Sequence, residues 1–182
     1  KDRDLVIGSF SAASNVTGII SDRVGISALL KAHGALSFWD YAAAAPYVEI
    51  NITGDADIQA MDGLFISPHK FVGGPGSPGL LVMRKSLMEN QVPARPGGGT
   101  VSYVNPKEHV YIDDHEHREE GGTPAIIESI RAGLVFQLKD RVGVDLIEKR
   151  EEEFVHRALK TWTANPNIQV LGNPDLPRLA II

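Results

Sequence analysis

Residues 65–79 read FISPHKFVGGPGSPG, where an apolar run ends in a histidine, a lysine and a glycine-rich loop. The apolar run has the length and composition of a short buried strand. The lysine at its end, Lys70, is typical of two situations, a solvated surface side chain and a nucleophilic amine held in a cleft. The sequence on either side of Lys70 helps to distinguish a surface lysine from a nucleophilic one.

Short apolar runs alternate with a helical pattern on the N-terminal side of this stretch. Strands are predicted at Leu5–Ser9, Leu36–Trp39 and Gly63–Ser67. A helix is predicted at Arg23–His33, with Gly34 as its C-terminal stop. This alternation favours βαβ units and a mostly parallel sheet, which is an α/β fold. The next apolar run, Leu80–Arg84, follows a loop too short for a parallel crossover, so we expect an antiparallel strand.

The remaining segments are predicted with less regular structure. An alanine-rich short helical piece, broken by Pro46, should follow Asp40. Residues 89–124 are rich in glycine and proline, which is typical of long loops, with one short hairpin expected among them.

Two helices are expected in the C-terminal third. Thr123 and Pro124 are typical of an N-cap followed by proline at the first helical position. The apolar face of this first helix is predicted from Ile126, Ile127, Ile130, Leu134 and Leu138. A second helix is predicted from about Val144 to Thr163, and a new strand from Arg178.

Composition narrows the classes of protein to which the chain belongs. It has 182 residues, 43% of them hydrophobic and 23% charged, which is ordinary for a globular domain. A net charge of -5 argues against a nucleic-acid partner, and no apolar stretch is long enough for a membrane span. The absence of cysteine fits a reducing compartment, so we expect a cytoplasmic protein. Because the chain starts without Met and ends in a predicted strand, we expect it to be an internal segment of a longer protein.

Polar residues follow the predicted parallel strands at the points where each strand ends. They are Asn15 after the first strand, Asp40 after the second, and Ser67, His69 and Lys70 after the third. Each is also compatible with an ordinary structural role; Asp40, for example, is equally typical of a helix N-cap. Parallel sheets, however, bind ligands outside the carboxyl ends of their strands, so these residues should converge on one edge.

A carboxylate and a lysine in one cleft suit a particular chemistry. A desolvated lysine amine forms a Schiff base with an aldehyde, and a carboxylate keeps a pyridine nitrogen protonated. At these residues the chain resembles the class V aminotransferases of fold-type I, the pyridoxal-phosphate family that contains the cysteine desulfurases. The resemblance rests on SNVTG at 14–18, DYA at 40–42, SPHK at 67–70 followed by GGPGSPGLLVMR, and EGGTP at 120–124. The order of these motifs also resembles the family, with Asp40 25 residues after Asn15 and Lys70 30 residues after Asp40.

The resemblance implies a role for each matching residue. Lys70 would carry pyridoxal 5'-phosphate as an aldimine and move the proton at the Cα of an amino-acid substrate. Asp40 would pair with the pyridine nitrogen, Ser67 and His69 would contact the phosphate, and Asn15 would lie near the phenolic oxygen and the substrate carboxylate.

The resemblance also implies an assembly and a domain division. Thr123 resembles the threonine that family dimers offer to the phosphate of the neighbouring subunit, which implies a homodimer with shared sites. Residues 1–140 would be part of a three-layer αβα large domain with one antiparallel strand, and 141–182 a linker helix and the start of a small α/β domain. We expect the chain by itself to hold the cofactor poorly.

One position departs from the desulfurase pattern. Desulfurases usually have glutamine at the fourth position of Asp-x-Ala-Gln, and here that position is Ala43. Transamination and desulfuration or elimination therefore both stay open. A catalytically silent relative, or a fragment that serves as an interaction module, is the alternative from another class.

The sequence gives little support for a metal site or a nucleotide-binding domain. DDHEH at 113–117 carries potential metal ligands, but a solvated acidic loop is the simpler interpretation. A nucleotide-binding domain is disfavoured because no Gly-x-Gly-x-x-Gly follows the first strand.

Overall fold

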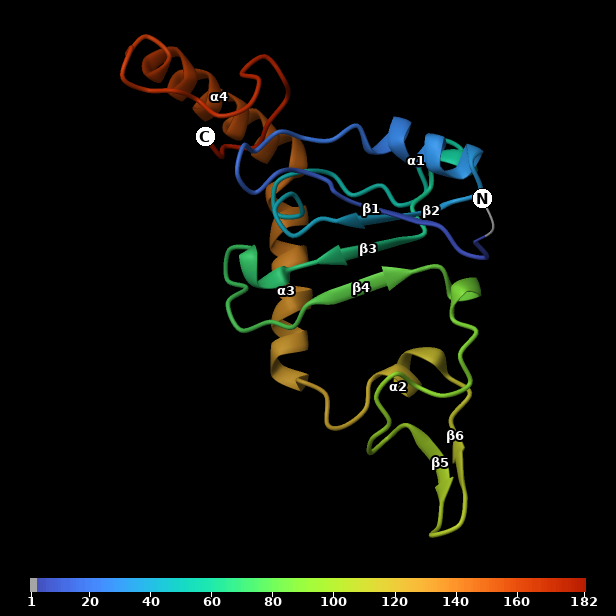
Figure 1. The fold of residues 1–182 in the computed structure, drawn as a ribbon. Coiled ribbons are helices and arrows are strands. Elements are labelled where there is room, and N and C mark those ends of the chain that lie inside the picture. Colours follow the sequence, from blue (N-terminus) through green and yellow to red (C-terminus); the bar gives the residue numbers. More distant parts are fainter. Residues whose placement is uncertain (1–2) are drawn as a thin grey trace. The chain divides into compact units, whose positions relative to one another are not determined.

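The computed structural model describes residues 3–182, which form two compact units. The first unit joins the residues up to Val82 with Glu128–Ile182, and the second is Met83–Ile127. The first unit contains a sheet and three helices, α1, α3 and α4, while the second contains a hairpin and the short helix α2 (Figure 1).

The sheet has four strands in the order β1-β2-β3-β4. Their bounds are Ile7–Ser11 for β1, Leu36–Asp40 for β2, Gly63–Ile66 for β3 and Leu80–Met83 for β4. The pairs β1/β2 and β2/β3 are parallel, whereas β4 runs opposite to β3 in Figure 1. This mixed sheet, with its helices, confirms the predicted α/β fold. The first strand begins two residues later than predicted, at Ile7, and extends to Ser11.

The core of the first unit is centred on Trp39, whose side chain is fully buried. Its indole nitrogen donates to two hydroxyl oxygens, Ser37 Oγ at 2.8 Å and Ser27 Oγ at 3.0 Å. Ser27 lies on α1 (Arg23–Ala32), which ends one residue before its predicted end. The buried hydrogen bonds therefore join α1 to β2 and fix the strand that ends in Asp40.

The alanine-rich segment after β2 is not the predicted helical piece. Residues 42–47 form consecutive turns, with only the bonds from Ala45 N to the Tyr41 oxygen and from Val48 N to the Ala44 oxygen spanning a helical turn. Pro46 has no N–H to donate, so a longer helical ladder cannot form through it.

Two long helices follow, α3 (Ile126–Val142) and α4 (Val144–Trp162), separated by Gly143. The prediction for the start of α3 was wrong, because Pro124 lies two residues before its first helical residue. Its predicted apolar residues are all exposed, by 45–65%, and the helix instead buries Ala132 and Val135. The strand predicted from Arg178 is also absent; this residue makes only one isolated bridge, to Ile19.

The second unit contains the predicted hairpin, formed by β5 (Val101–Val104) and β6 (His109–Tyr111). The short helix α2 (His115–Glu119) was not predicted. Its Arg118 is buried and donates to the carbonyl oxygens of Asn90 at 2.7 Å and Ile112 at 3.2 Å. Three short 3-10 turns complete the structure: Asp57–Gln59, Pro68–Lys70 and Lys85–Leu87.

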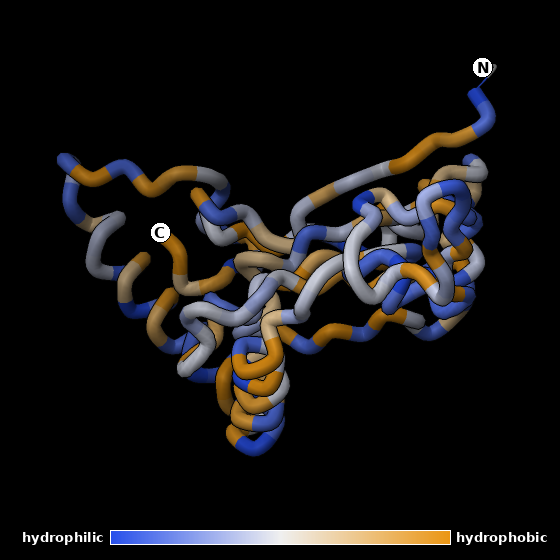
Figure 2. The backbone as a smooth tube through the Cα atoms, turned by 90° about the horizontal axis from the view of Figure 1, so that it is seen from below, coloured by the Kyte–Doolittle hydropathy of each residue, from blue (hydrophilic) through white to orange (hydrophobic). Residues whose placement is uncertain are grey.

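An exposed apolar run leads into the edge strand β1 and includes its first residue. Leu5, Val6 and Ile7 are each about half or more exposed, and they form the orange stretch near the N label in Figure 2. Within residues 3–182, no helix has the length and apolar character to cross a membrane.

Candidate functional site

The register of the parallel strands brings three strand ends to one edge of the sheet. Ser11 of β1, Asp40 of β2 and Phe65 of β3 lie at the same level. Beyond that level the pairing continues, since Ala12 N donates to the Asp40 carbonyl and Tyr41 N donates to the Phe65 carbonyl, both at 2.8 Å. The predicted convergence of the segments that follow these strands is therefore present in the backbone.

The segment after β2, residues 40–48, is here called the Asp40 loop. The carboxylate of Asp40 is partly buried, and its Oδ1 accepts a hydrogen bond of 2.7 Å from Ala42 N. Asp40 thus caps the turns that follow it, as the alternative interpretation from sequence expected, while its Oδ2 has no hydrogen-bond partner within residues 3–182. The next side chain, Tyr41, is buried, and burial raises the pKa of its phenol despite the opposing effect of Arg23.

The segment after β3, residues 67–77, is here called the Lys70 turn. Lys70 N donates to the Ser67 carbonyl at 3.0 Å, which closes a 3-10 turn. The backbone at Gly74 packs so closely against Pro68 that an added Cβ would lie 1.9 Å from the Pro68 carbonyl oxygen. Only glycine fits there, so the glycine-rich sequence after the lysine is a requirement of this tight backbone.

Side-chain contacts also fix the end of the Lys70 turn. The hydroxyl of Ser77 donates to the Gly74 carbonyl at 2.7 Å, and Arg131 of α3 donates to the Pro75 carbonyl at the same distance. Phe71, the residue after the lysine, is buried against Phe136 of α3 with ring centroids 4.9 Å apart. The backbone that carries Lys70 is therefore held firmly from α3.

The three polar side chains at the start of this turn, unlike Ser77 at its end, are unengaged. Lys70 and His69 are exposed and Ser67 is partly buried, and none of the three makes a side-chain hydrogen bond or ion pair within residues 3–182. An amine, an imidazole and a hydroxyl thus stand free on one turn beside the carboxylate that ends the neighbouring strand.

Asn15 lies at the exposed tip of the loop that follows β1. The Ser14 hydroxyl accepts from the backbone nitrogens of Val16 and Thr17, both at 3.1 Å, and so shapes the tip. At Gly18, with φ of 69°, an added Cβ would lie 2.7 Å from the Ile181 carbonyl oxygen. The glycine in SNVTG is therefore needed for the close approach of residues 179–181.

Thr123 lies in the second unit, where its side chain is exposed and has no partner within residues 3–182. The acidic motif nearby is a helix cap, since Asp114 accepts from His117 N at 2.9 Å and contacts His117 Nδ1 at 3.0 Å. These hydrogen bonds lower the pKa of Asp114 and raise the pKa of His117. The described residues include no group of three or more His, Cys, Asp or Glu that could hold a metal ion.

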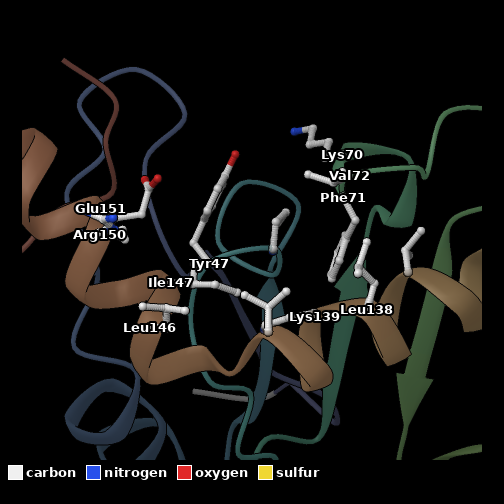
Figure 3. Close-up of a pocket in the computed structure, with 13 residues that line it drawn as sticks. Tyr47, Lys70, Phe71, Val72, Leu138, Lys139, Leu146, Ile147, Arg150 and Glu151 are labelled. Carbon is white, nitrogen blue, oxygen red and sulfur yellow. The ribbon is translucent and has the colours of Figure 1, made fainter.

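A largely apolar pocket of about 580 Å³ borders Lys70. Figure 3 shows Lys70 at the top of the view, and Leu138 of α3 with Leu146 and Ile147 of α4 lower, along the two helices. Its lining includes none of the other five predicted site residues. The pocket therefore adjoins the lysine on the α3–α4 side and is separate from the edge where Asp40 and Ser67 lie.

Sequence reasoning missed Lys139, a half-buried lysine of α3 that also lines this pocket. Its ammonium donates to the carbonyl oxygens of Ala45 and Val48 and lies 6.0 Å from the centroid of the Phe71 ring. Burial lowers the pKa of this ammonium, while Glu148 and Glu49 oppose that effect. The available signal was its spacing, because Lys139 falls three or four residues after Val135 and Phe136, on the buried side of the helix.

Comparison with known proteins decides the family. A sequence model described as aminotransferase class-V matches residues 2–182. The chain belongs to this family. A probable cysteine desulfurase of Staphylococcus aureus (strain N315) is 30% identical over 171 residues, which cover 93% of this chain and 40% of that protein. A probable cysteine desulfurase of Halalkalibacterium halodurans is 30% identical over 161 residues, which cover 87% of this chain and 38% of that protein.

Solved structures agree with the class-V aminotransferase assignment. The apo structure of a cysteine desulfurase from Thermococcus onnurineus NA1 has a TM-score of 0.76 at 27% identity, over 87% of this chain and 38% of that one. The cysteine desulfurase CsdA of Escherichia coli, at 22% identity, shares the fold with a TM-score of 0.74 over 88% of this chain and 39% of that one. The chain spans about 40% of the length of the curated relatives it matches.

The residues present fit the family's cofactor, pyridoxal phosphate. This ligand presents an aldehyde, a basic ring nitrogen and a phosphate, which require an amine, a carboxylate and hydrogen-bond donors respectively. Lys70, Asp40, and the pair Ser67 and His69 offer these groups at or just after two neighbouring strand ends. Within residues 3–182, Oδ2 of Asp40 and the other three side chains have no hydrogen-bond partner.

Proposed function

We propose that this chain supplies the cofactor-binding lysine and its partners in a pyridoxal-phosphate enzyme that acts on an amino acid. The observation that carries the proposal is the register of β2 and β3, in which Asp40 pairs with Phe65, two residues before Ser67. A carboxylate at the end of one strand and a lysine-bearing turn after the next therefore lie at the same edge of the sheet, and we propose that a flat ligand binds between them.

Pyridoxal phosphate, when bound, supplies an aldehyde and an electron-withdrawing ring that stabilises negative charge at the substrate Cα. The role of Asp40 in the proposal is to hold a proton on the ring nitrogen. Its Oδ1 already accepts from Ala42 N, which leaves Oδ2 for this contact. The Ala42 hydrogen bond orients the carboxylate, and the negative charge favours the protonated nitrogen.

Lys70 is the residue proposed to bind the cofactor covalently and then to move a proton at the substrate Cα. Its backbone is fixed by the Ser67 carbonyl and by Gly74, while its long side chain is unengaged. A fixed backbone with an unengaged amine suits a side chain that must alternate between two positions. Ser67 and His69 are proposed to donate to the phosphate from the same turn.

The remaining assignments extend the proposal to substrate and partner. Asn15 would contact the phenolic oxygen and the substrate carboxylate from its loop tip. Thr123 would serve the phosphate of a second subunit in a homodimer with shared sites. The relatives are named as probable cysteine desulfurases, which supports desulfuration or elimination, but Ala43 stands where the desulfurase pattern has glutamine. Transamination therefore stays part of the proposal.

Reductive labelling tests the proposal on the 182-residue chain. The chain is incubated with increasing pyridoxal phosphate, reduced with borohydride, digested and mapped by mass spectrometry. We expect weak labelling concentrated on Lys70, with the label lost from this peptide in Lys70→Ala and little changed in a matched Lys85→Ala variant. Labelling spread evenly over exposed lysines would favour the catalytically silent alternative.

A further inference from the structure

Lys139 contacts both segments that carry the proposed cofactor residues. It comes from α3, and its ammonium donates to the Ala45 carbonyl at 2.7 Å and to the Val48 carbonyl, at the far end of the Asp40 loop. The same ammonium lies over the ring of Phe71, which follows Lys70 directly. One side chain therefore reaches from α3 to the Asp40 loop and to the Lys70 turn.

The Asp40 loop needs this contact because of its own sequence. Its turns close with Ala45 N on the Tyr41 carbonyl and with Tyr47 N and Val48 N on the Ala44 carbonyl. No helix continues past Pro46, so the carbonyls of Ala45 and Val48 receive no donor from a following helical turn. Lys139 is the donor to both.

Lys139 holds the end of the loop through charged hydrogen bonds. A hydrogen bond with a charged donor is stronger than one between neutral groups. At the other end the carboxylate of Asp40 accepts from Ala42 N, so the loop is held at both its beginning and its end.

Phe136, one turn before Lys139 on α3, packs against Phe71. The helix therefore holds the Lys70 turn through Phe136 and the Asp40 loop through Lys139. These two contacts, three residues apart on one helix, connect both segments to α3.

We infer that Lys139 is a positioning residue that fixes the Asp40 loop relative to the Lys70 turn, and that removing its ammonium weakens cofactor capture by Lys70. The second half of this inference rests on the proposed function. Lys139 is not proposed as a cofactor-binding amine, because two of the three N–H groups of its ammonium already donate to backbone carbonyls.

The absence of cysteine from the sequence allows a matched test. In Lys139→Cys the single thiol is alkylated in denaturant and the chain is refolded. Bromoethylamine gives a side chain of the same length as lysine with its ammonium, and ethyl iodide gives the same stem without nitrogen. The two forms differ only in the ammonium, which a change to a natural residue cannot achieve. Lys160→Met, on the exposed side of α4, serves as a control for loss of a lysine charge.

Two quantities are measured at a temperature where all forms are folded. One is the amide hydrogen exchange of residues 42–48, and the other is the pyridoxal phosphate concentration that half-labels Lys70. We expect the aminoethyl form and Lys160→Met to match the unaltered chain. The ethyl form should exchange faster in 42–48 than elsewhere and require about ten-fold more pyridoxal phosphate, a factor equivalent to ~1.4 kcal/mol.

Two other results for the ethyl form overturn the inference, and one result for the unaltered chain overturns the proposed function. If the ethyl form folds and its Lys70 is half-labelled at the same pyridoxal phosphate concentration as in the unaltered chain, Lys139 has no positioning role. This holds even if residues 42–48 of the ethyl form exchange faster. An ethyl form that fails to fold, or exchanges faster throughout, makes Lys139 a general stabilising residue. If the unaltered chain never labels Lys70, the proposed function fails instead, and exchange in 42–48 still decides whether Lys139 fixes the loop.

Discussion

The Asp40 loop and the Lys70 turn follow neighbouring strands, yet the chain treats their functional side chains differently. The carboxylate of Asp40 is partly buried and takes part in shaping its own loop, through its hydrogen bond from Ala42 N. The amine of Lys70 is exposed and unbonded, although the backbone beneath it is tightly built. This difference suits the proposed roles, in which the carboxylate of Asp40 keeps one position while the amine of Lys70 moves.

Removing Trp39, the buried residue before Asp40 on β2, should have the largest effect on the free energy of unfolding. Trp39→Ala deletes a fully buried side chain and leaves the Ser27 and Ser37 hydroxyls without their indole donor. We expect a loss of about 3–5 kcal/mol in the free energy of unfolding, measured by urea titration with circular dichroism. Trp162→Ala, at a position that is 41% exposed, should lose much less. Equal losses at both positions would contradict the central place of Trp39.

Breaking the Lys70 turn comes next. Gly74→Ala sets a methyl group against the Pro68 carbonyl, so the backbone must shift, and we expect a loss of about 3 kcal/mol. Gly133→Ala on α3 is the matched control, because no atom lies within 4 Å of its added Cβ. This control should be stabilising by about 0.5–1 kcal/mol, since alanine favours a helix over glycine. Thermal unfolding of both variants checks the prediction, which fails if Gly74→Ala is as stable as the control.

The two functions of Asp40 can be separated. Asp40→Ala removes the acceptor for Ala42 N and should cost about 1 kcal/mol, as loss of a capping side chain does. Asp40→Asn keeps an oxygen acceptor and should be nearly as stable as the unaltered chain. Both variants should reduce labelling of Lys70 by pyridoxal phosphate, because neither has the negative charge that is proposed to pair with the protonated ring nitrogen. An Asn variant that labels normally would leave Asp40 with a structural role alone.

The smallest effect on stability is expected at Lys70 itself. Its side chain makes no hydrogen bond or ion pair within residues 3–182, so Lys70→Ala should change the free energy of unfolding by less than about 0.5 kcal/mol. A larger loss in urea titration would show that the lysine supports the fold, and the contrast with Asp40 would disappear.

The sheet and its edge could be predicted from the sequence because short apolar runs that alternate with a helical pattern are typical of parallel α/β sheets. The predictions for the strand that ends in Asp40, the strand that precedes the Lys70 turn and the helix α1 agree with the structure to within one or two residues. The antiparallel β4 followed from the length of its loop. The identity of the family was also readable, from four motifs in order.

Local competition accounts for the errors. The alanine run after Asp40 favours helix by composition, but Pro46 and the cap of Asp40 turn it into a loop. In α3 the large aliphatic residues suggested a core face, while the structure buries the side with Ala132 and Val135. A helix with apolar residues on two sides has two candidate faces, and sequence alone cannot select one. Lys139 was missed for the same reason, because it lies on the side of α3 with Val135 and not on the predicted apolar face.

The central claim is that Asp40 and Lys70 border one ligand. An experimental structure of the protein with pyridoxal phosphate tests it most directly. The account predicts that the cofactor is attached to the Nζ atom of Lys70, with its ring nitrogen about 3 Å from a carboxylate oxygen of Asp40. A cofactor attached to another lysine, or attached to Lys70 with its ring nitrogen turned away from Asp40, would contradict the account.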